Sequence, residues 1–276
     1  MKDNVISIVI NLDTRPGIFD EVTVADTMLK GTRSIDFLTE GVRNKQRFFT
    51  GYEIETILFV DVHESIPPTT MQEMLDIADT VVISKHREYF NQADYFPKTN
   101  DINYLQAISL AKGKYIAHFD SDMAAFCNDR SVVYEWLQWL DFDRYEYISY
   151  PSHWSPVAVD DPDFLDYMWT STRFFICRKD TIQYDEILKC LSSSDYLYTK
   201  YPVKRKCPWF EHILGLLSTR EKIFYPPIEP HRYFIFSWDA YRRGLFKELN
   251  NTLYPEIKRF VMNKGINYPC NVNGGN

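Results

Sequence analysis

The sequence predicts an α/β fold with a mostly parallel central sheet covered by helices. Apolar, β-branched runs recur through the first half of the chain, each run stops at polar residues, and segments with helical spacing separate the runs. This alternation is typical of parallel strands joined by crossover helices. With 276 residues, of which 45% are hydrophobic, the chain is long enough to bury one extensive core. We therefore expect a single domain over residues 1–276.

The strands and helices of this fold can be assigned from the period of the apolar residues. Strands are predicted at 5–10, 55–61, 79–84, 115–119 and 173–177. Helices are predicted at 24–37, 71–78, 103–111, 132–140, 210–217 and about 238–250. The basic residues Lys112 and Lys114 flank Gly113 after the third helix, which is how a helix commonly ends.

Composition excludes several classes of protein. The net charge of −7 argues against a broad cationic surface for nucleic acid, so no nucleic-acid partner is expected. No apolar run approaches the roughly 18 residues of a membrane span, and a cytoplasmic location is expected. The basic segment Tyr241-Arg-Arg243 allows at most peripheral membrane contact. The five cysteines contain no C-x-x-C pair, which predicts mostly buried thiols rather than a disulfide framework or structural zinc site.

Acidic residues follow the predicted strands. Asp13, Asp61 and the pair Asp120/Asp122 all lie where an apolar run stops. In open α/β sheets, ligands bind beyond the carboxyl ends of the strands, so these carboxylates are expected to converge on one crevice, where they require a cation. The chain has two further Asp-x-Asp sequences, Asp141/Asp143 and Asp161/Asp163. Both lie in polar loops and are interpreted as solvated acids.

Other interpretations of the Asp120 motif agree less well with the sequence. An EF-hand loop beginning there would need a ligand at 124, glycine at 125 and glutamate at 131, but the chain has Ala124, Ala125 and Ser131. A haloacid-dehalogenase-type phosphatase would carry its motif near the start of the domain and would not have alanine at the fifth place. A sugar nucleotidylyltransferase typically has a glycine-rich loop after its first strand, but the loop 11–17 contains only one glycine. This class of enzyme therefore stays as a remote alternative.

Three stretches together resemble the nucleotide-sugar glycosyltransferases of the GT-A fold, most closely the inverting family 2 enzymes. The stretch 7–15 is similar to their opening strand and nucleotide loop, 59–65 to their second-strand acidic element, and 103–122 to their N-x₇-A-x-G pattern ending in D-x-D. Asn11, in place of proline, and Val62 are departures. The resemblance implies a Rossmann-like, three-layer α/β/α sandwich with a nucleotide-binding half at 1–125 and an acceptor-binding half at 126–270.

The resemblance also implies a UDP- or GDP-sugar donor, a Mn²⁺ or Mg²⁺ ion and a saccharide or other hydroxyl acceptor. The ion would neutralise the diphosphate leaving group. The metal ligands expected on this basis are Asp120, Asp122 and His231. The residues expected to contact the donor are Asn11, Asp13, Thr14, Arg15, Asp61, Asn103, Asp120, Ser121 and Arg232.

An inverting transfer, which the family likeness alone implies, needs a base for the acceptor hydroxyl. The segment 209–212 is the best counterpart of the family's acidic E-D pair, and either Glu211 or His212 could be the base. A helix-initial glutamate that only complements the helix dipole is the alternative. His63, His118 and His153 are interpreted as structural or rim residues. A catalytically degraded nucleotide- or carbohydrate-binding protein with the same fold is the alternative function.

Overall fold

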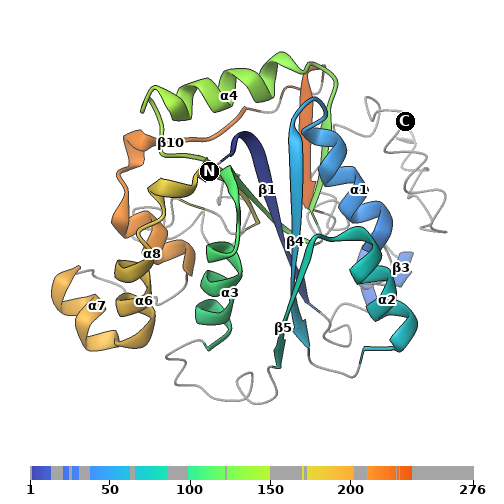
Figure 1. Cartoon of the computed structure of the whole chain (residues 1–276), viewed down its shortest axis with the longest axis horizontal. Coiled ribbons are helices and arrows are strands. Elements are labelled where there is room, and N and C mark those ends of the chain that lie inside the picture. Colours follow the sequence, from blue (N-terminus) through green and yellow to red (C-terminus); the bar gives the residue numbers. More distant parts are fainter. Residues whose placement is uncertain are drawn as a thin grey trace, which may run out of the picture.

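The computed structural model of the chain describes residues 2–13, 21–24, 27–30, 38–62, 66–85, 99–121, 123–149, 170, 173–201, 210–227, 229 and 231–237. A seven-stranded sheet lies at the centre of the described structure, with helices on both of its faces (Figure 1). The predicted α/β class with a mostly parallel central sheet is confirmed.

The strand order of the central sheet is β10-β8-β9-β6-β1-β4-β5. The bounds are β1 Lys2–Asp13, β4 Glu53–Val62, β5 Thr80–Lys85, β6 Gly113–Asp120, β8 Tyr147–Ser149, β9 Phe174–Arg178 and β10 Ile223–Phe224. Strand β9 runs antiparallel to its neighbours β6 and β8, while the other neighbouring strands pair in parallel. All five predicted strands are present.

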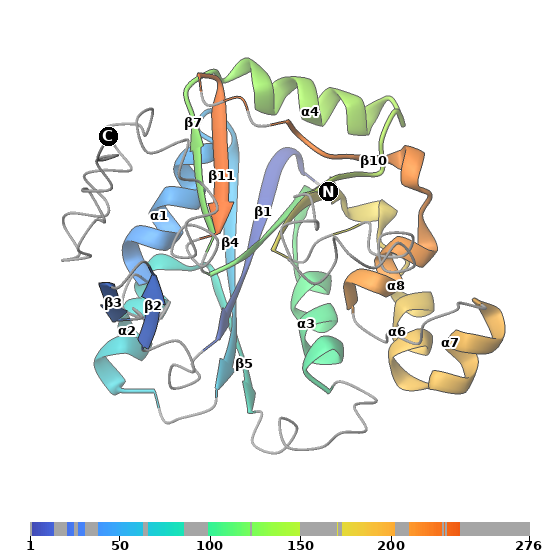
Figure 2. The same cartoon turned by 180° about the vertical axis from the view of Figure 1, so that it is seen from behind.

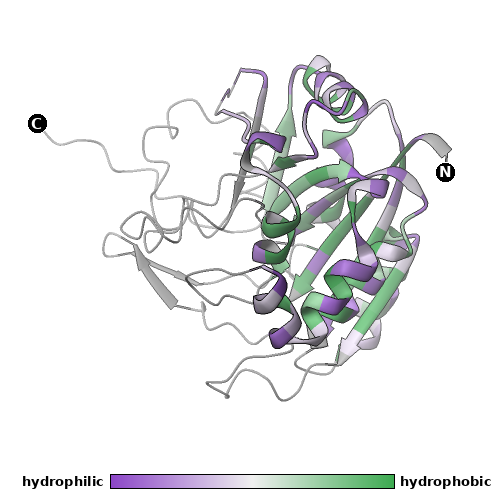
Figure 3. Cartoon of the chain, turned by 90° about the vertical axis from the view of Figure 1, so that its left-hand side faces the viewer, coloured by the Kyte–Doolittle hydropathy of each residue, from purple (hydrophilic) through white to green (hydrophobic). Residues whose placement is uncertain are grey.

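Helices cover both faces of the sheet, and the sheet separates two apolar cores (Figure 1). On one face lie α1 Leu38–Phe48, α2 Pro68–Ile77 and α4 Ser131–Asp141. On the other lie α3 Thr99–Ser109, α6 Tyr184–Ser192, α7 Ser194–Lys200 and α8 Phe210–Leu217. Side chains of β1 alternate between the two cores, Ile10 and Leu12 packing on the first face and Val9 on the second. The strands are accordingly apolar over most of their length (Figure 3).

The helix predicted at 24–37 is wrong. A small antiparallel pair, β2 Glu21–Val24 and β3 Thr27–Lys30, occupies part of this range, and the crossover helix α1 begins only at Leu38. The β-branched residues Val22, Thr23 and Val24 favour a strand over a helix. Helix α1 was missed because its buried residues include polar ones, Asn44 and Lys45.

Residues 120–123, which join β6 to β7 and are called the acidic turn below, lead into a second small sheet. Strand β7, Met123–Cys127, pairs antiparallel with β11, Tyr233–Ser237, and the two lie side by side next to α1 and α4 (Figure 2). Two 3₁₀ turns, Lys179–Thr181 and Arg220–Lys222, complete the described elements. Among the described residues, no helix is long and apolar enough to cross a membrane. The helix predicted at 238–250 lies outside the described residues.

The described cysteines agree with the prediction of unpaired, mostly buried thiols. Cys177 and Cys190 are buried and Cys127 is partly buried, and all three are free. Burial raises the pKa of the Cys177 thiol, and it raises that of Cys190 to about 11. These thiols therefore stay protonated and pack as small apolar groups.

Candidate functional site

The carboxyl ends of the parallel strands meet at one edge of the sheet, as predicted. Asn11 of β1 lies opposite Asp120 of β6, and Asp13 lies opposite Asp61 of β4. Asp61 in turn lies opposite Ser84, near the end of β5. The register therefore places three of the predicted donor-site strands side by side at the level of their acidic residues.

Asn11 and Asp61 face the same side of the sheet, toward α3. Val9 and Phe59 belong to the core beneath α3, and side chains two positions apart on a strand share a face. Asp61 is 5% exposed, and the Asn11 Oδ1 atom is buried without a hydrogen-bond partner among the described residues. A buried carboxylate and an open acceptor at a strand end are features that a polar ligand can use.

Asp120 ends β6 on the same face, and its backbone is fixed on both sides. Its N–H donates to the Arg173 carbonyl at 2.9 Å, and the Ser121 N–H donates to the Asn11 carbonyl at 2.9 Å. The Asp120 side chain is 30% exposed, and its Oδ1 lies 3.5 Å from Nε2 of His118. The carboxylate is thus partly exposed at this edge of the sheet, while the backbone at Asp120 and Ser121 is held to β1 and to the residue before β9.

Asn103 joins the start of α3 to the same edge. Its Nδ2 donates to Ser84 Oγ at 2.9 Å, which ties the second turn of the helix to the end of β5. The amino terminus of α3 therefore lies at the carboxyl edge of the sheet (Figure 1). The partial positive charge of a helix amino terminus favours anions such as phosphate at this position.

The carboxylates suit a hard divalent cation. Asp120 offers a partly exposed carboxylate oxygen, which is the ligand type that Mg²⁺ and Mn²⁺ prefer. Asp122, the second expected ligand, lies outside the described residues. Within the part of the chain that the structure describes, no three His, Cys, Asp or Glu side chains are grouped to hold a metal ion. Of the three expected metal ligands, Asp120 is the one that the described residues place at this edge with a partly exposed carboxylate.

The start of α8 lies against the same face. The Phe210 ring contacts the ring of Tyr104 edge-on, with centroids 5.5 Å apart, and Tyr104 lies on α3. This contact brings Glu211 and His212 to the side of the sheet that carries Asp120. His212 is 1% exposed, so it packs inside the protein, whereas the side chain of Glu211 is not among the described ones.

His231 and Arg232 lie beyond the end of β7 that is far from Asp120. Strand β7 leads away from the acidic turn for about 13 Å, at roughly 3.3 Å per residue, before it reaches Cys127. The N–H groups of Asn128 and Asp129 donate to the Arg232 carbonyl at 2.8 and 3.0 Å, which places Arg232 beyond that far end. His231 and Arg232 come just before β11, and the first residue of β11, Tyr233, pairs with Cys127 at the far end of β7. The prediction that His231 and Arg232 join Asp120 at the donor site does not agree with this arrangement.

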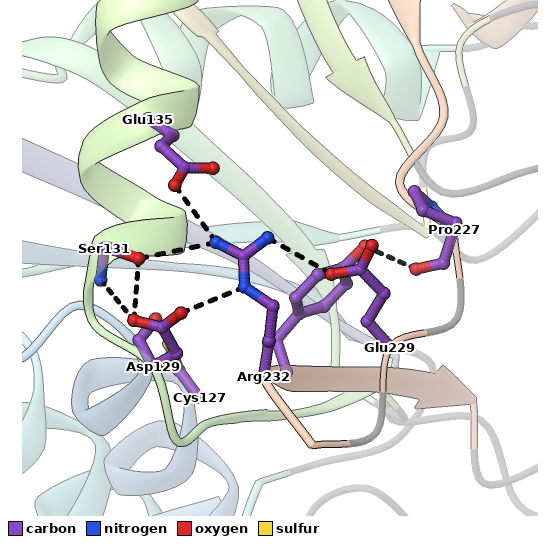
Figure 4. A network of polar contacts seen from close by, with 8 residues as sticks. Cys127, Asp129, Ser131, Glu135, Pro227, Glu229 and Arg232 are labelled. Atoms are coloured by element: carbon purple, nitrogen blue, oxygen red, sulfur yellow. Dashed lines mark hydrogen bonds and ion pairs between the residues drawn. The ribbon is translucent and has the colours of Figure 1, made fainter.

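Arg232 instead forms a cluster of ion pairs (Figure 4). Its guanidinium lies 2.9 Å from Asp129, 3.1 Å from Glu135 and 3.2 Å from Glu229. Hydrogen bonds from Ser131 and from Arg232 lower the pKa of Asp129 to about 2, so the Asp129 carboxylate stays ionised at neutral pH. It fastens the segment before β11 to the start of α4.

Several predicted site residues lie outside the described part of the chain. Thr14, Arg15 and Asp122 lie outside the described residues, as do His63 and His153. Asp13 is described only through its backbone position in β1.

Two residues that contact this edge, Lys45 and His118, were not predicted from the sequence to belong to the site. Lys45 of α1 is 1% exposed and donates from Nζ to the carbonyls of Ser121 and Met123, at 3.2 and 2.7 Å. His118, interpreted as structural, contacts both Tyr104 and Asp120. A lysine on the apolar face of α1, four positions after Gly41 and three after Val42, is the one signal that could have indicated the first contact.

No protein-family model matches the chain, and no curated protein matches it. Among solved structures, the galactosyltransferase LgtC, in complex with donor and acceptor sugar analogs, is similar to 94% of this chain over 99% of its own length. The sequence identity is 12% and the TM-score 0.51.

Two other structures are similar over shorter parts of their length. S. aureus TarS 1-349, in complex with UDP-GlcNAc, covers 83% of this chain at 12% identity and a TM-score of 0.42. A mycobacterial protein covers 64% at 13% identity and a TM-score of 0.37. The chain spans 57% of the TarS chain and 54% of the mycobacterial one. At these identities it is the likeness to LgtC that carries weight, and it shows a shared fold, the GT-A-like α/β fold that the sequence predicts.

Proposed function

We propose that the chain is a glycosyltransferase that moves a sugar from a UDP- or GDP-sugar to a hydroxyl of a saccharide or other acceptor, with Mn²⁺ or Mg²⁺ at the donor site. The observation that supports this most is the convergence of Asn11, Asp61 and Asp120 at the carboxyl edge of the sheet. In this fold a nucleotide binds at that edge. In this proposal residues 1–125 bind the nucleotide and 126–270 bind the acceptor.

Each residue of the edge has a role in the proposed transfer. Asp61 and Asn11 orient the nucleoside, while Asp120 and Asp122 hold the metal and the diphosphate. A bound divalent ion supplies Lewis acidity that makes the nucleoside diphosphate a better leaving group. The amino terminus of α3 adds a positive potential for the phosphates, with Asn103 fixing its position.

Glu211 is the proposed base for the acceptor hydroxyl. The Phe210–Tyr104 contact brings the start of α8 to the face that carries Asp120, and the burial of His212 leaves Glu211 as the better candidate. We propose inversion because the family 2 resemblance implies it. We expect Glu211→Gln to lower kcat for transfer by about 10²-fold while leaving the donor KM within about threefold, as removal of a general base does. Steady-state kinetics measures kcat and the donor KM, and proton NMR of the anomeric product shows whether the configuration is inverted. A parallel loss of donor affinity would contradict the assignment.

Asp120→Asn tests the donor site. We expect turnover of UDP- or GDP-sugar, followed as nucleotide release, to require Mn²⁺ or Mg²⁺ and to fall by about 10²-fold in this variant, since the amide cannot supply the carboxylate charge. Asp143→Asn is the matched control, because it removes an exposed carboxylate from another Asp-x-Asp sequence at a position with φ 52° that asparagine tolerates. Nucleotide binding without metal-stimulated turnover in the wild type would indicate the non-catalytic binding protein instead.

A further inference from the structure

His118 is a polar residue in the middle of the fold. It lies on the central strand β6, two positions before Asp120, and its side chain has no exposed surface. An imidazole in such a place is stable when its ring nitrogens have polar partners. The partners of this ring connect α3 to the candidate donor site.

The plane of the His118 ring is fixed by two aromatic neighbours. Phe175 of β9 stacks on it, with centroids 5.1 Å apart and the planes 26° apart. Tyr104 of α3 meets it edge-on at 5.1 Å and 76°. All three rings are buried, so the imidazole cannot turn without moving two core side chains.

The two ring nitrogens have different partners. The Tyr104 hydroxyl is hydrogen-bonded to Nδ1, and Nε2 lies 3.5 Å from the Asp120 carboxylate. Burial raises the pKa of Tyr104 well above its usual range, so the phenol keeps its proton. A phenol that donates to Nδ1 leaves the ring proton on Nε2, the nitrogen that lies 3.5 Å from the Asp120 carboxylate. The opposite tautomer would direct a nitrogen lone pair at the carboxylate.

The backbone around Asp120 is already fixed by its hydrogen bonds to Arg173 and Asn11. The Asp120 side chain can still rotate, so the orientation of its carboxylate is not fixed by these backbone hydrogen bonds. A positively polarised N–H on a ring that cannot rotate is suited to restrict it, as outer-sphere partners of ligating carboxylates do elsewhere.

We propose that Tyr104 and His118 form a buried hydrogen-bond relay that orients the Asp120 carboxylate, which makes His118 a positioning residue for the bound nucleotide. The relay extends from α3 through β6 to the carboxyl edge. Its effect on ligand affinity rests on the proposed function, in which Asp120 contacts the donor.

Affinity for UDP with Mn²⁺, measured by calorimetry, tests the relay. His118→Phe keeps the ring stack and removes the donor, and we expect it to weaken binding by about tenfold. His118→Gln places an amide N–H near the former Nε2 and should restore affinity to within about threefold of the wild type. Tyr104→Phe should lie between the wild type and His118→Phe. Ile116→Ala, on the same strand and in the same core, is the control for general disturbance and should leave affinity within about twofold. Equal losses in His118→Phe and Ile116→Ala, or no recovery in His118→Gln, would overturn the proposal.

A second measurement does not depend on donor binding. In ¹⁵N-histidine-labelled protein, with the His118 signals assigned by their loss in His118→Gln, we expect a protonated Nε2 and an unprotonated Nδ1 at neutral pH. Tyr104→Phe should abolish the hydrogen-bond shift of Nδ1. A protonated Nδ1 with bare Nε2 would overturn the relay. If wild-type protein binds neither UDP nor GDP, the proposed function fails, and the nitrogen shifts alone decide whether the relay exists.

Discussion

Replacing Gly113 with alanine is expected to lower the free energy of unfolding by about 3 kcal/mol, at the upper end of overpacking effects. A Cβ at this position would lie 2.6 Å from the Val5 carbonyl oxygen and 2.8 Å from both the backbone nitrogen and Oγ of Ser7. Two of these atoms belong to the backbone of β1, which lies between β6 and β4 and cannot move aside without disturbing its pairing with β4.

The same corner of the fold contains a buried polar network that a shift would break. Ser7 Oγ donates to Glu55 Oε2 at 2.5 Å and accepts from the Gly113 N–H at 2.9 Å. The Lys112 N–H also donates to Glu55 Oε2, at 2.7 Å. Ser7 has no exposed surface, so losing its partners would leave a buried hydroxyl unsatisfied, which costs about 1–3 kcal/mol.

Urea unfolding followed by circular dichroism measures the effect, and Gly41→Ala is the matched control. A Cβ at Gly41 in helix α1 meets only Nζ of Lys45, at 3.9 Å, so alanine should stabilise the protein by up to about 1 kcal/mol through the helix backbone. The same substitution is therefore expected to have opposite signs at the two sites. A Gly113→Ala protein as stable as Gly41→Ala would show that β1 and β6 do not approach each other this closely.

The sequence indicated that a glycine matters at 113 but for a different reason. From sequence it is the residue that ends a helix, a position that often requires a left-handed backbone. In the structure, among the described glycines, only Gly51 has a positive φ, of 106°. Gly113 is needed for space beside β1, and a contact between residues so far apart along the chain leaves no local signal.

The strands could be predicted from sequence where both of their faces are buried. Strands such as β1 and β4 are apolar on both sides because helices cover both faces of the sheet, so their sequences stand out as continuous runs. The failure at 24–37 has the opposite cause. Among the described residues, β2 and β3 pair only with each other, and short pairs outside the main sheet leave a weak pattern that resembles a helix as much as a strand.

The candidate site was predictable only in part for a related reason. That Asp61 and Asp120 lie at one edge follows from parallel topology alone. The position of His231 depends on how β11 pairs with β7, and spacing along the sequence carries no information about that pairing. The contacts of Tyr104 with His118 likewise depend on the packing of α3 against β6, which a single sequence does not reveal.

The acidic turn itself depends on Lys45. This side chain reaches from α1 with its ammonium 5.8 Å from the Phe119 ring centroid and donates to the carbonyls on both sides of residue 122, those of Ser121 and Met123. Asn44, the preceding residue, exchanges two hydrogen bonds with the backbone of Ala125, at 2.9 and 2.8 Å. Together these two residues of α1 hold Ser121, Met123 and Ala125, which are described residues on either side of position 122.

Lys45→Met is therefore expected to lower the free energy of unfolding by about 4 kcal/mol, because a chain of similar volume leaves buried carbonyls without their charged donor. It should also weaken binding of UDP with Mn²⁺ by about tenfold or more, since the turn would no longer be held in place. Urea unfolding and calorimetry measure the two effects. Lys189→Met is the control, because Lys189 is exposed on α6 and its loss should change stability by no more than about 0.5 kcal/mol. If Lys45→Met matched this control in both measurements, the backbone of the acidic turn would have to be fixed by β1, β7 and β9 alone, and the buried ammonium would have no part in forming the site.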